Sequence, residues 1–359
     1  MPYSLYDHAP SRSWRHLNTC EYQTYIHAKI PRVYCEDHGM LQAKLPWCDK
    51  KSSFTQMMEG YILDALIYCE NITGATRICN ISWDQAFLIM QRGVERGMLR
   101  RGMTSTTMIA IDEKAFKKGH KYLTIISDLE KGIVLHIEED RKKASLDSFY
   151  NTLEPEQKNN IIGVSMDMWP AYINSTIEQI DPKKEKIVFD RFHISAMLGE
   201  AVDDVRKEEH RKLLDEDNCV LTGTKYMWLY SQENLPEKYI DDYNKLTTSN
   251  LETARAWSFK EEFRHFFDYK SKGWAEKFFE SWYSRAMKSK LKSIINVAKT
   301  LQNHLYGLLN YAKLQISNGI AEGLNSKIMA IKRRARGHRN IENLKTAIFF
   351  YCGNLSVYP

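Results

Sequence analysis

The stretch "IIGVSMDMWPAY", residues 161–172, joins an apolar run to an acidic residue. The run has the composition of a buried strand, and Pro170 is well placed to open a helix after it. Asp167 stands between the two, where a charged side chain costs free energy unless it has a partner. Two interpretations are open: Asp167 caps the helix that follows, or it is a metal ligand whose partners lie elsewhere in the chain.

Alternating elements surround this stretch. Strands are predicted at residues 106–112, 121–127, 133–139, 161–167 and 185–190, and helices at 145–153, at 170–180 and from Phe192. This order favours a mixed α/β sheet: three strands come first, and then a helix, a strand, a helix, a strand and a helix follow. Asp112 and Asp167 end two of the strands, and Asp190 closes the last one.

Asp112 and Asp167 are therefore expected to lie side by side at one edge of the sheet. Two neighbouring carboxylates do not both stay ionised without a cation between them. Mg²⁺ and Mn²⁺ prefer oxygen ligands, so these side chains suit either ion. Two such ions can hold the attacking and leaving oxygens of a phosphodiester.

A basic segment, residues 285–339, contains twelve lysine and arginine residues and a single acidic residue, Glu322. The segment either faces a polyanion such as DNA or is a solvated basic surface. A helix is predicted at residues 317–337, capped by Ser317 and ended by Gly337. Its spacing defines a polar face of Asn318, Glu322 and Asn325 and an apolar face of Ile320, Leu324, Ile328 and Ile331. Glu322 either pairs with Lys327 or a nearby arginine, or is a third metal ligand, which the two aspartates favour.

The N-terminal part contains two further patterns. Residues 53–98 read as three helices, with Ser82 capping the third, in the arrangement of a helix-turn-helix that enters a DNA groove. Many helical hairpins bind nothing, so this pattern leaves DNA binding open. Within residues 1–50, Cys35 and His38 in "CEDHG" have metal-ligand spacing, but a zinc site needs four ligands.

Composition sets the class of protein. The 359 residues are 43% hydrophobic and 27% charged, as in an ordinary globular protein. The sequence contains no apolar run long enough to span a membrane, and its first residues lead us to expect no signal peptide. Seven scattered cysteines favour a reducing, cytoplasmic setting. Residues 195–315 have a helical, aromatic-rich pattern with no strand signal.

Several motifs together carry a resemblance to a known family. They are "IAIDEKAFKKGHKYLTIISDLEKG", "VSMDMWPAY", "VFDRFHI", "AVDDVRKEE", "KYMWL" and "SNGIAEGLNSKIMAIKRRARGHRN". With them the sequence resembles the ISL-three family of bacterial insertion-sequence transposases, from about residue 14 to the end. The resemblance implies a ribonuclease-H-like core with Asp112, Asp167 and Glu322 as the catalytic, metal-binding DDE triad. The "DRFH" motif is similar to the Asp-x-x-His element of related transposases, which places Asp190 and His193 near the site. Asn318 and Asn325 are expected near the site as well, because they share the polar helix face with Glu322.

The resemblance also implies a domain organisation around a mixed five-stranded sheet. The expected parts are an N-terminal module at 1–50, a helix-turn-helix region at 51–105, the first part of the core at 106–198, an all-α insertion at 199–312 and a C-terminal core helix with a basic tail at 313–359. Family members open with a zinc-binding module whose first cysteine pair lies upstream of a stretch like "YDHAPSRSWRHLNTC". Only Cys35 and His38 match its ligands, as a possible remnant, so the chain is expected to hold no stoichiometric zinc.

The expected function is that of a DNA transposase that binds terminal inverted repeats, cleaves a strand with two Mg²⁺ or Mn²⁺ ions and transfers it to target DNA. The residues expected to contact DNA are Lys327, Lys332, Arg333, Arg334, Arg336, Arg339, Arg77 and Arg92. We expect the protein to act as a homodimer or higher oligomer on double-stranded DNA. We also expect it to lie near the bacterial nucleoid and to make no contact with a membrane. Residues 1–105 are expected to bind DNA without the core. The alternatives are a nuclease of the same fold that lacks strand transfer and a non-catalytic DNA-binding protein derived from a transposase.

Overall fold

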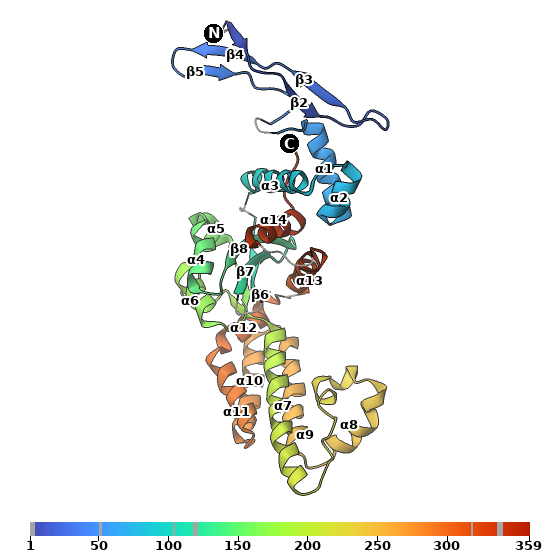
Figure 1. Cartoon of the computed structure of the whole chain (residues 1–359). Helices are drawn as coiled ribbons and strands as arrows, with labels where there is room; N and C mark the ends of the chain where they lie inside the picture. Colours follow the sequence, from blue (N-terminus) through green and yellow to red (C-terminus); the bar gives the residue numbers. More distant parts are fainter. Residues whose placement is uncertain (1–3, 50–51, 103–104, 118–120, 317–318, 336–339) are drawn as a thin grey trace. The chain divides into compact units, whose positions relative to one another are not determined.

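The computed structural model describes residues 4–49, 52–102, 105–117, 121–316, 319–335 and 340–359. Two compact units make up the chain (Figure 1): one contains Met1–Gly102 with Leu324–Pro359, and the other contains Met103–Gly323. No helix in the described part of the chain is both long and apolar enough to cross a membrane.

The first unit begins with short strands. These are β1 (Leu5–His8), β2 (Arg12–Arg15), β3 (Tyr25–Ala28), β4 (Pro31–Cys35) and β5 (Gly39–Gln42). Strands β1, β4 and β5 form one antiparallel sheet, and β2 pairs with β3 in a second. Trp14, Ile30 and Cys48 are buried together and form a small core for this region.

Three helices follow, as the sequence predicts: α1 (Gln56–Cys69), α2 (Ile72–Cys79) and α3 (Trp83–Arg100). The turn between α2 and α3 depends on Asn80, whose backbone is left-handed with φ of 50°. Ser82 and Gln85 then form a capping box, in which each side chain accepts a hydrogen bond from the other residue's backbone N–H. The predicted cap at Ser82 is thus confirmed.

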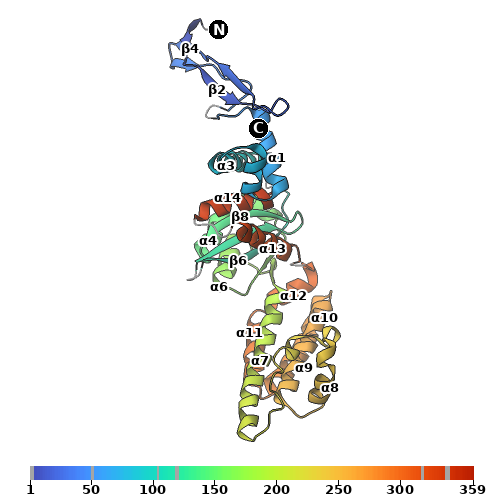
Figure 2. The ribbon, with the colours of Figure 1, turned by 45° about the vertical axis from the view of Figure 1, so that its right-hand side comes forward.

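The C-terminal segment of the chain completes the core of these helices. The helix predicted at residues 317–337 was expected to be the last of the chain, and this was wrong, because α14 (Ile341–Cys352) follows it and packs beside α3 (Figure 2). Its apolar residues run nearly all round the helix, which leaves a weak periodic signal in the sequence. Phe350 and Val357 are buried in the same cluster as Ile62 and Ile89.

Hydrogen bonds fasten the last residues to the same helices. Arg96 Nη1 donates to the carbonyl of Val357 at 2.6 Å, and Arg100 Nη1 donates to that of Tyr358 at 2.7 Å. The Tyr358 hydroxyl donates to Asp64 Oδ1 at 2.6 Å. A fragment that ends near residue 105 would lack all of these contacts. The expectation that residues 1–105 bind DNA without the core stays a prediction.

Replacing Phe350 with alanine is therefore expected to destabilise this unit and to weaken its binding to DNA. Loss of a buried phenylalanine costs about 3–5 kcal/mol of unfolding free energy, and Phe350 is only 6% exposed. Thermal unfolding measures the loss of stability, and a gel shift with double-stranded DNA measures the loss of the DNA binding that the sequence leads us to expect. Tyr68→Ala is the matched control, because that ring on α1 is 84% exposed. An unchanged melting temperature for Phe350→Ala would contradict the conclusion that α14 is part of the core of this unit.

The second unit is built on a mixed five-stranded sheet. Its strands are β6 (Met108–Lys117), β7 (Lys121–Asp128), β8 (Ile133–Glu139), β9 (Gly163–Met166) and β10 (Ile187–Phe189), in the spatial order β10-β9-β6-β7-β8. Strand β6 is antiparallel to β7 and parallel to β9, which is parallel to β10. The mixed sheet is confirmed, but β6 does not end at Asp112 as predicted. Pairing of Lys114 with Leu123 and of Ala115 with Tyr122 extends it.

The two faces of the sheet are covered differently. Helices α4 (Lys143–Asn151), α5 (Pro155–Asn160) and α6 (Pro170–Gln179) follow β8 and β9, and α5 was not predicted. Side chains of α4 and α6 pack with Ile109, Ile111 and Val164. Because side chains alternate along a strand, Ala110 points to the opposite face. There it clusters with Val188, Ile316 and Ala321.

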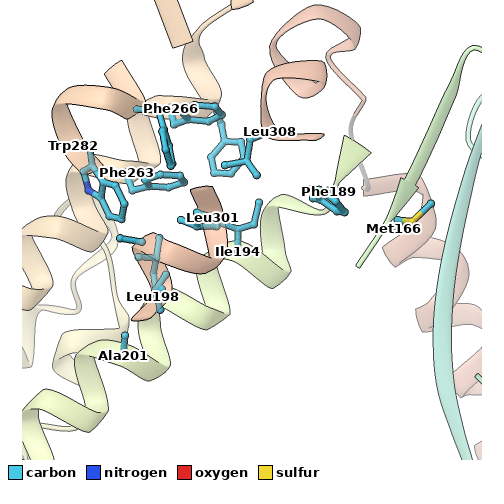
Figure 3. Packing of buried hydrophobic residues seen from close by; sticks show 14 of the residues in the cluster. Met166, Phe189, Ile194, Leu198, Ala201, Phe263, Phe266, Trp282, Leu301 and Leu308 are labelled. Atoms are coloured by element: carbon cyan, nitrogen blue, oxygen red, sulfur yellow. The ribbon is translucent and has the colours of Figure 1, made fainter. Parts of the chain in front are cut away.

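From β10 the chain runs into helices, as expected for residues 195–315. These are α7 (Arg191–Asp215), α8 (Ile240–Thr247), α9 (Glu252–Arg264), α10 (Lys272–Lys288), α11 (Lys292–Asn303) and α12 (Leu305–Leu314). Ile194 and Leu198 of α7 face the aromatic rings of Phe263 and Trp282, whose centroids are 4.7 Å apart (Figure 3). This core holds α7 against α9 and α11.

The contact between β10 and α12 is especially close. The ring of Phe189 packs edge-on against His304 and Tyr306, with centroids 5.3 and 5.5 Å away. A Cβ atom on Gly307 would lie 2.4 Å from the Phe189 ring, so only glycine fits there. The end of β10, and with it the start of α7, is thereby held in place.

The last helix of the basic segment is α13 (Gly319–Arg334). Its predicted cap, Ser317, and its predicted end, Gly337, lie outside the described residues. The buried face runs through Ala321, Leu324, Ile328 and Ile331. Ile320, predicted on that face, is 43% exposed.

Candidate active site

Asp112 and Asp167 lie next to each other because of the register between β6 and β9. These parallel strands pair Ala110 with Ser165, and the same register continued by two residues sets Asp112 beside Asp167. Both side chains then project from the face of the sheet on which Ala110 lies, since alternate residues share a face. Carboxyl ends of parallel strands are a common place for ligand sites in α/β proteins.

Asp190 continues this row on the next strand. Its backbone N–H donates to the carbonyl of Met166 at 3.0 Å, directly before Asp167. Its side chain accepts from the N–H of Phe192 at 2.8 Å and so caps α7. The three aspartates therefore lie on three adjacent strands: Asp112 within β6, and Asp167 and Asp190 directly after the ends of β9 and β10.

The first turn of α7 directs His193 back at this row. His193 Nε2 lies 2.8 Å from Asp167 Oδ1 and 3.9 Å from Asp190 Oδ2. The hydrogen bond with Asp167 raises the pKa of His193 above its usual value, because the carboxylate stabilises the imidazolium. Asp190 and His193 thus both lie beside Asp167, and their role in a site stays a prediction.

One ligand atom each from Asp112, Asp167 and His193 lies within 4.8 Å of the other two. Trp169, and not Asp167, is the N-cap residue of α6, so the helix-cap interpretation of Asp167 was wrong. Lys114 Nζ lies 3.0 Å from Asp112 Oδ2, so each of the two carboxylates has a basic neighbour. Two carboxylate ligands and one imidazole suit a divalent cation.

Glu322 lies in the first turn of α13, with an exposed side chain. It does not belong to the group formed by Asp112, Asp167 and His193. Its neighbour Ala321 is buried against Ala110 and Val188, so α13 begins on the sheet face from which Asp112 projects. Asn318 lies outside the described residues, and Asn325 is half-buried on α13.

Three residues around the aspartates were missed by the sequence analysis. Lys114 follows Asp112 on β6, and Trp169 follows Asp167 in the stretch "DMWPAY". Arg141 comes from the segment between β8 and α4, and its guanidinium lies 4.7 Å from the centre of the Trp169 ring. Trp169 could have been found from its place beside Asp167, whereas Arg141 has no comparable signal in the sequence.

The residues expected to contact DNA have different surroundings. On α2 Arg77 is exposed, and on α13 Lys327 and Arg333 are exposed while Lys332 is half-buried. Arg92 pairs with the buried Glu59, which gives it a structural contact. Arg334 forms an ion pair with Glu70. Arg336 and Arg339 lie outside the described residues.

Cys35 and His38 lie together at the turn between β4 and β5. The Cys35 Sγ atom is 3.5 Å from His38 Nδ1. Asp37 joins them in a group whose ligand atoms lie within 4.8 Å of one another. A thiolate, an imidazole and a carboxylate are all ligands that zinc accepts.

Comparison with known proteins identifies the family of the chain. A family model for the DDE transposases of the ISL3 type, described as transposase, matches residues 109–348, which include Asp112, Asp167 and Glu322. The chain belongs to the ISL3 transposase family. It is a DDE transposase, an enzyme that cleaves DNA and transfers the cut strand. A model of the helix-turn-helix domain of transposase family ISL3 matches residues 43–86, which confirms the predicted helix-turn-helix.

Two curated relatives cover most of the transposase. The transposase for insertion sequence element IS1001 of Bordetella parapertussis is 26% identical over 335 residues, covering 92% of this chain and 82% of the relative. The transposase for insertion sequence element IS1557 of Mycobacterium tuberculosis is 24% identical over 372 residues, covering 95% of this chain and 82% of the relative.

The comparison corrects the expectation about zinc. A model for the zinc-finger of transposases IS204, IS1001, IS1096 and IS1165 matches residues 3–38. This range ends on the Cys35–His38 pair. The expected absence of zinc is therefore not supported.

Proposed function

We propose that this transposase cuts the ends of its insertion element and joins the freed 3′ hydroxyl to target DNA at a site formed by Asp112, Asp167 and Glu322. The observation that carries the proposal is the convergence of three side chains. Asp112 comes from β6, Asp167 follows the parallel strand β9, and His193 lies in the first turn of α7. Glu322 is proposed as the third acid because α13 begins on the same sheet face.

A ribonuclease-H-like core is proposed for the second unit. Its support is the order of three antiparallel strands followed by two parallel strands that are reached through helices. We propose the helical segment 199–312 as an insertion between the strand that ends before Asp190 and the helix that carries Glu322. The proposed boundaries of the remaining parts are 1–50, 51–105, 106–198 and 313–359.

Asp112, Asp167 and Glu322 are proposed to hold two Mg²⁺ or Mn²⁺ ions, with Asp190 and His193 beside them. Oxygen atoms of carboxylates are the ligands that these ions prefer, so the donor set fits. When bound, such ions stabilise negative charge at a reacting phosphate and favour deprotonation of a nucleophile. Asn318 and Asn325 are proposed as near-site residues on the same helix.

The surrounding side chains of the protein position the reacting groups. His193 is held by Asp167 at 2.8 Å and can donate a hydrogen bond to a phosphate oxygen at the edge of the site. Lys114 supplies positive charge beside Asp112. Asp190 fixes the start of α7, and therefore the position of His193, by capping the helix.

Cleavage of DNA that carries the element's ends tests the proposed function. The purified chain should nick this DNA with Mg²⁺ and should not do so with EDTA. Transfer of the cut end to a second DNA separates a transposase from a nuclease of the same fold. Because an element has two ends, we also propose that at least two copies of the chain act together. Absence of cleavage with both Mg²⁺ and Mn²⁺ would refute the proposal and favour a non-catalytic DNA-binding protein.

DNA is proposed to contact the basic surface of α13 and the helix-turn-helix. The expected phosphate contacts are Lys327, Lys332, Arg333, Arg334, Arg336 and Arg339, together with Arg77 on α2. Arg92 is proposed only as a supporting residue, because it pairs with Glu59. Zinc is proposed to bind at Cys35 and His38, with Asp37 close enough to contribute.

Replacing Lys327 and Arg333 together with alanine is expected to weaken binding to every DNA sequence. Each lost phosphate contact should reduce the slope of log affinity against log salt by about 0.9. Titrations at several salt concentrations measure that slope. Lys299→Ala is the matched control, because this exposed lysine of α11 lies in the same basic segment. An unchanged slope in the double variant would show that α13 presents a solvated basic surface.

A further inference from the structure

Trp169 has a position that core packing does not explain. It follows Asp167 by two residues and lines, with Asp167 and His193, a cavity of about 310 Å³. Its side chain is 38% exposed, which is unusual for the largest side chain of the site. As the N-cap residue of α6 it forms no side-chain cap hydrogen bond, so helix capping does not account for it either.

The indole ring is held rigidly in this cavity. Its Nε1–H donates to the carbonyl of Arg141 at 2.9 Å. The guanidinium of Arg141 lies 4.7 Å from the centre of the Trp169 ring and 4.5 Å from that of Tyr122. Arg141 Nη1 is in turn 3.2 Å from Glu113 Oε1. The ring is therefore fixed before any substrate binds, which lowers the entropy cost of using it as a contact surface.

The charge of the cavity indicates what the ring contacts. Glu113, Glu200 and Asp167 line the wall. Arg141 pairs with Glu113 and His193 with Asp167, so the three carboxylates outnumber their two basic partners and a second phosphate is disfavoured there. An uncharged heterocycle with N–H donors fits such a wall, because carboxylates accept hydrogen bonds. The volume lies at the lower end of the ~300–1,000 Å³ that ligand pockets occupy, which suits a single base.

We infer that Trp169 is a stacking platform for one unpaired nucleobase of the DNA substrate, the base next to the phosphate that is cut. This inference rests on the proposed function of Asp112 and Asp167. Every base presents a flat face to an aromatic ring, so such stacking tolerates many sequences. A base that leaves the helix costs stacking and pairing energy, and Trp169 would recover part of that cost. The phosphate of that nucleotide is then held at the aspartates.

Cleavage rates on two substrates test the platform. One substrate carries the normal base beside the cut, and the other carries an abasic residue there. Trp169→Ala should lower the rate on the normal substrate about tenfold to a hundredfold. The cleavage rate of the wild-type chain should fall by a similar factor on the abasic substrate. On that substrate, Trp169→Ala should lower the rate little further. If Trp169→Ala lowers the cleavage rate by the same factor on both substrates, the inference is overturned.

Three further variants separate stacking from a structural role. Trp169→Phe keeps an aromatic face and should retain most of the rate, whereas Trp169→Leu keeps an apolar side chain and should not. Trp274→Ala is the matched control, since this tryptophan of α10 is 63% exposed and has a lysine over its ring but does not line the cavity. Loss of rate in Trp169→Leu equal to that in Trp169→Phe would contradict stacking.

A binding measurement distinguishes failure of this inference from failure of the proposed function. The DNA carries 2-aminopurine beside the cut, a fluorescent base whose emission falls when it stacks, and Ca²⁺ replaces Mg²⁺ to slow cleavage. Emission from the Trp169→Ala complex should exceed that from the wild-type complex at equal occupancy. If the wild-type chain does not cleave with Mg²⁺, the proposed function fails, and the emission still decides about Trp169. Equal emission from the two complexes overturns the inference.

Discussion

Replacing Asp167 with asparagine is expected to abolish Mg²⁺-dependent cleavage, while the transposase still folds and binds DNA. Asparagine keeps the size of the side chain and removes the charge that the proposed site needs. Loss of a metal ligand at a reacting phosphate forfeits several kcal/mol of transition-state stabilisation, which corresponds to about three orders of magnitude in rate. The fold loses only the contact with His193, a half-exposed residue, and such pairs contribute about 0–1 kcal/mol.

Single-turnover cleavage, a gel shift and thermal unfolding measure the three properties of the Asp167→Asn variant. Asp112→Asn should show the same loss, and the double variant should be little worse than either, because the two ligands act as a unit. Asp204→Asn is the matched control: this carboxylate of α7 is 58% exposed and pairs with Lys207 instead of contacting the site. Cleavage by Asp167→Asn within tenfold of the wild type would rule out a role for this carboxylate in holding the ions.

Replacing Glu322 with glutamine is expected to cause a loss of cleavage of similar size, again with intact folding and DNA binding. Glutamine preserves the length and helix propensity of the residue. Because Glu322 is exposed in the first turn of α13, its charge stabilises the helix by about 0.3–1 kcal/mol at most. A large loss of rate with a small loss of stability would therefore identify a ligand.

Glu342→Gln is the matched control for this experiment, because Glu342 occupies the first turn of α14 in the same way. Both variants should lower the melting temperature slightly, and only Glu322→Gln should lose cleavage. Near wild-type cleavage by Glu322→Gln would exclude it as the third acid. Asp190 would then be the best candidate, since it lies beside Asp167 and contacts His193 at 3.9 Å. Glu209 would be a poor one, because it accepts hydrogen bonds from the first residues of α9.

Local patterns predicted most of the secondary structure that carries the site. The strands that lead to Asp112, Asp167 and Asp190 and the helices of the helix-turn-helix follow from apolar periodicity and from caps such as Ser82. Such signals depend on neighbours in the chain, within about one helical turn or along one strand. The same reasoning placed the end of β6 too early, because pairing with β7 extends that strand past a charged residue.

The sequence by itself determined the family, through its motifs. It also predicted the mixed sheet and the strands that lead to Asp112 and Asp167, because apolar spacing along the chain is enough to place them. Only the tertiary structure decided which side chains meet these aspartates. Strand register sets Asp112 beside Asp167, and the start of α7 sets His193 against both Asp167 and Asp190. Arg141 reaches Trp169 from another connection.

The C-terminal segment shows most clearly that the sequence alone does not predict contacts between distant elements. Arg96 donates to the carbonyl of Val357 across 261 residues of sequence. No local pattern encodes such a contact, because burial of α14 against α1 and α3 depends on the complementary shapes of surfaces that exist only after the helices have formed. Spacing along the chain decides which element a residue joins, and packing between elements decides what that residue touches.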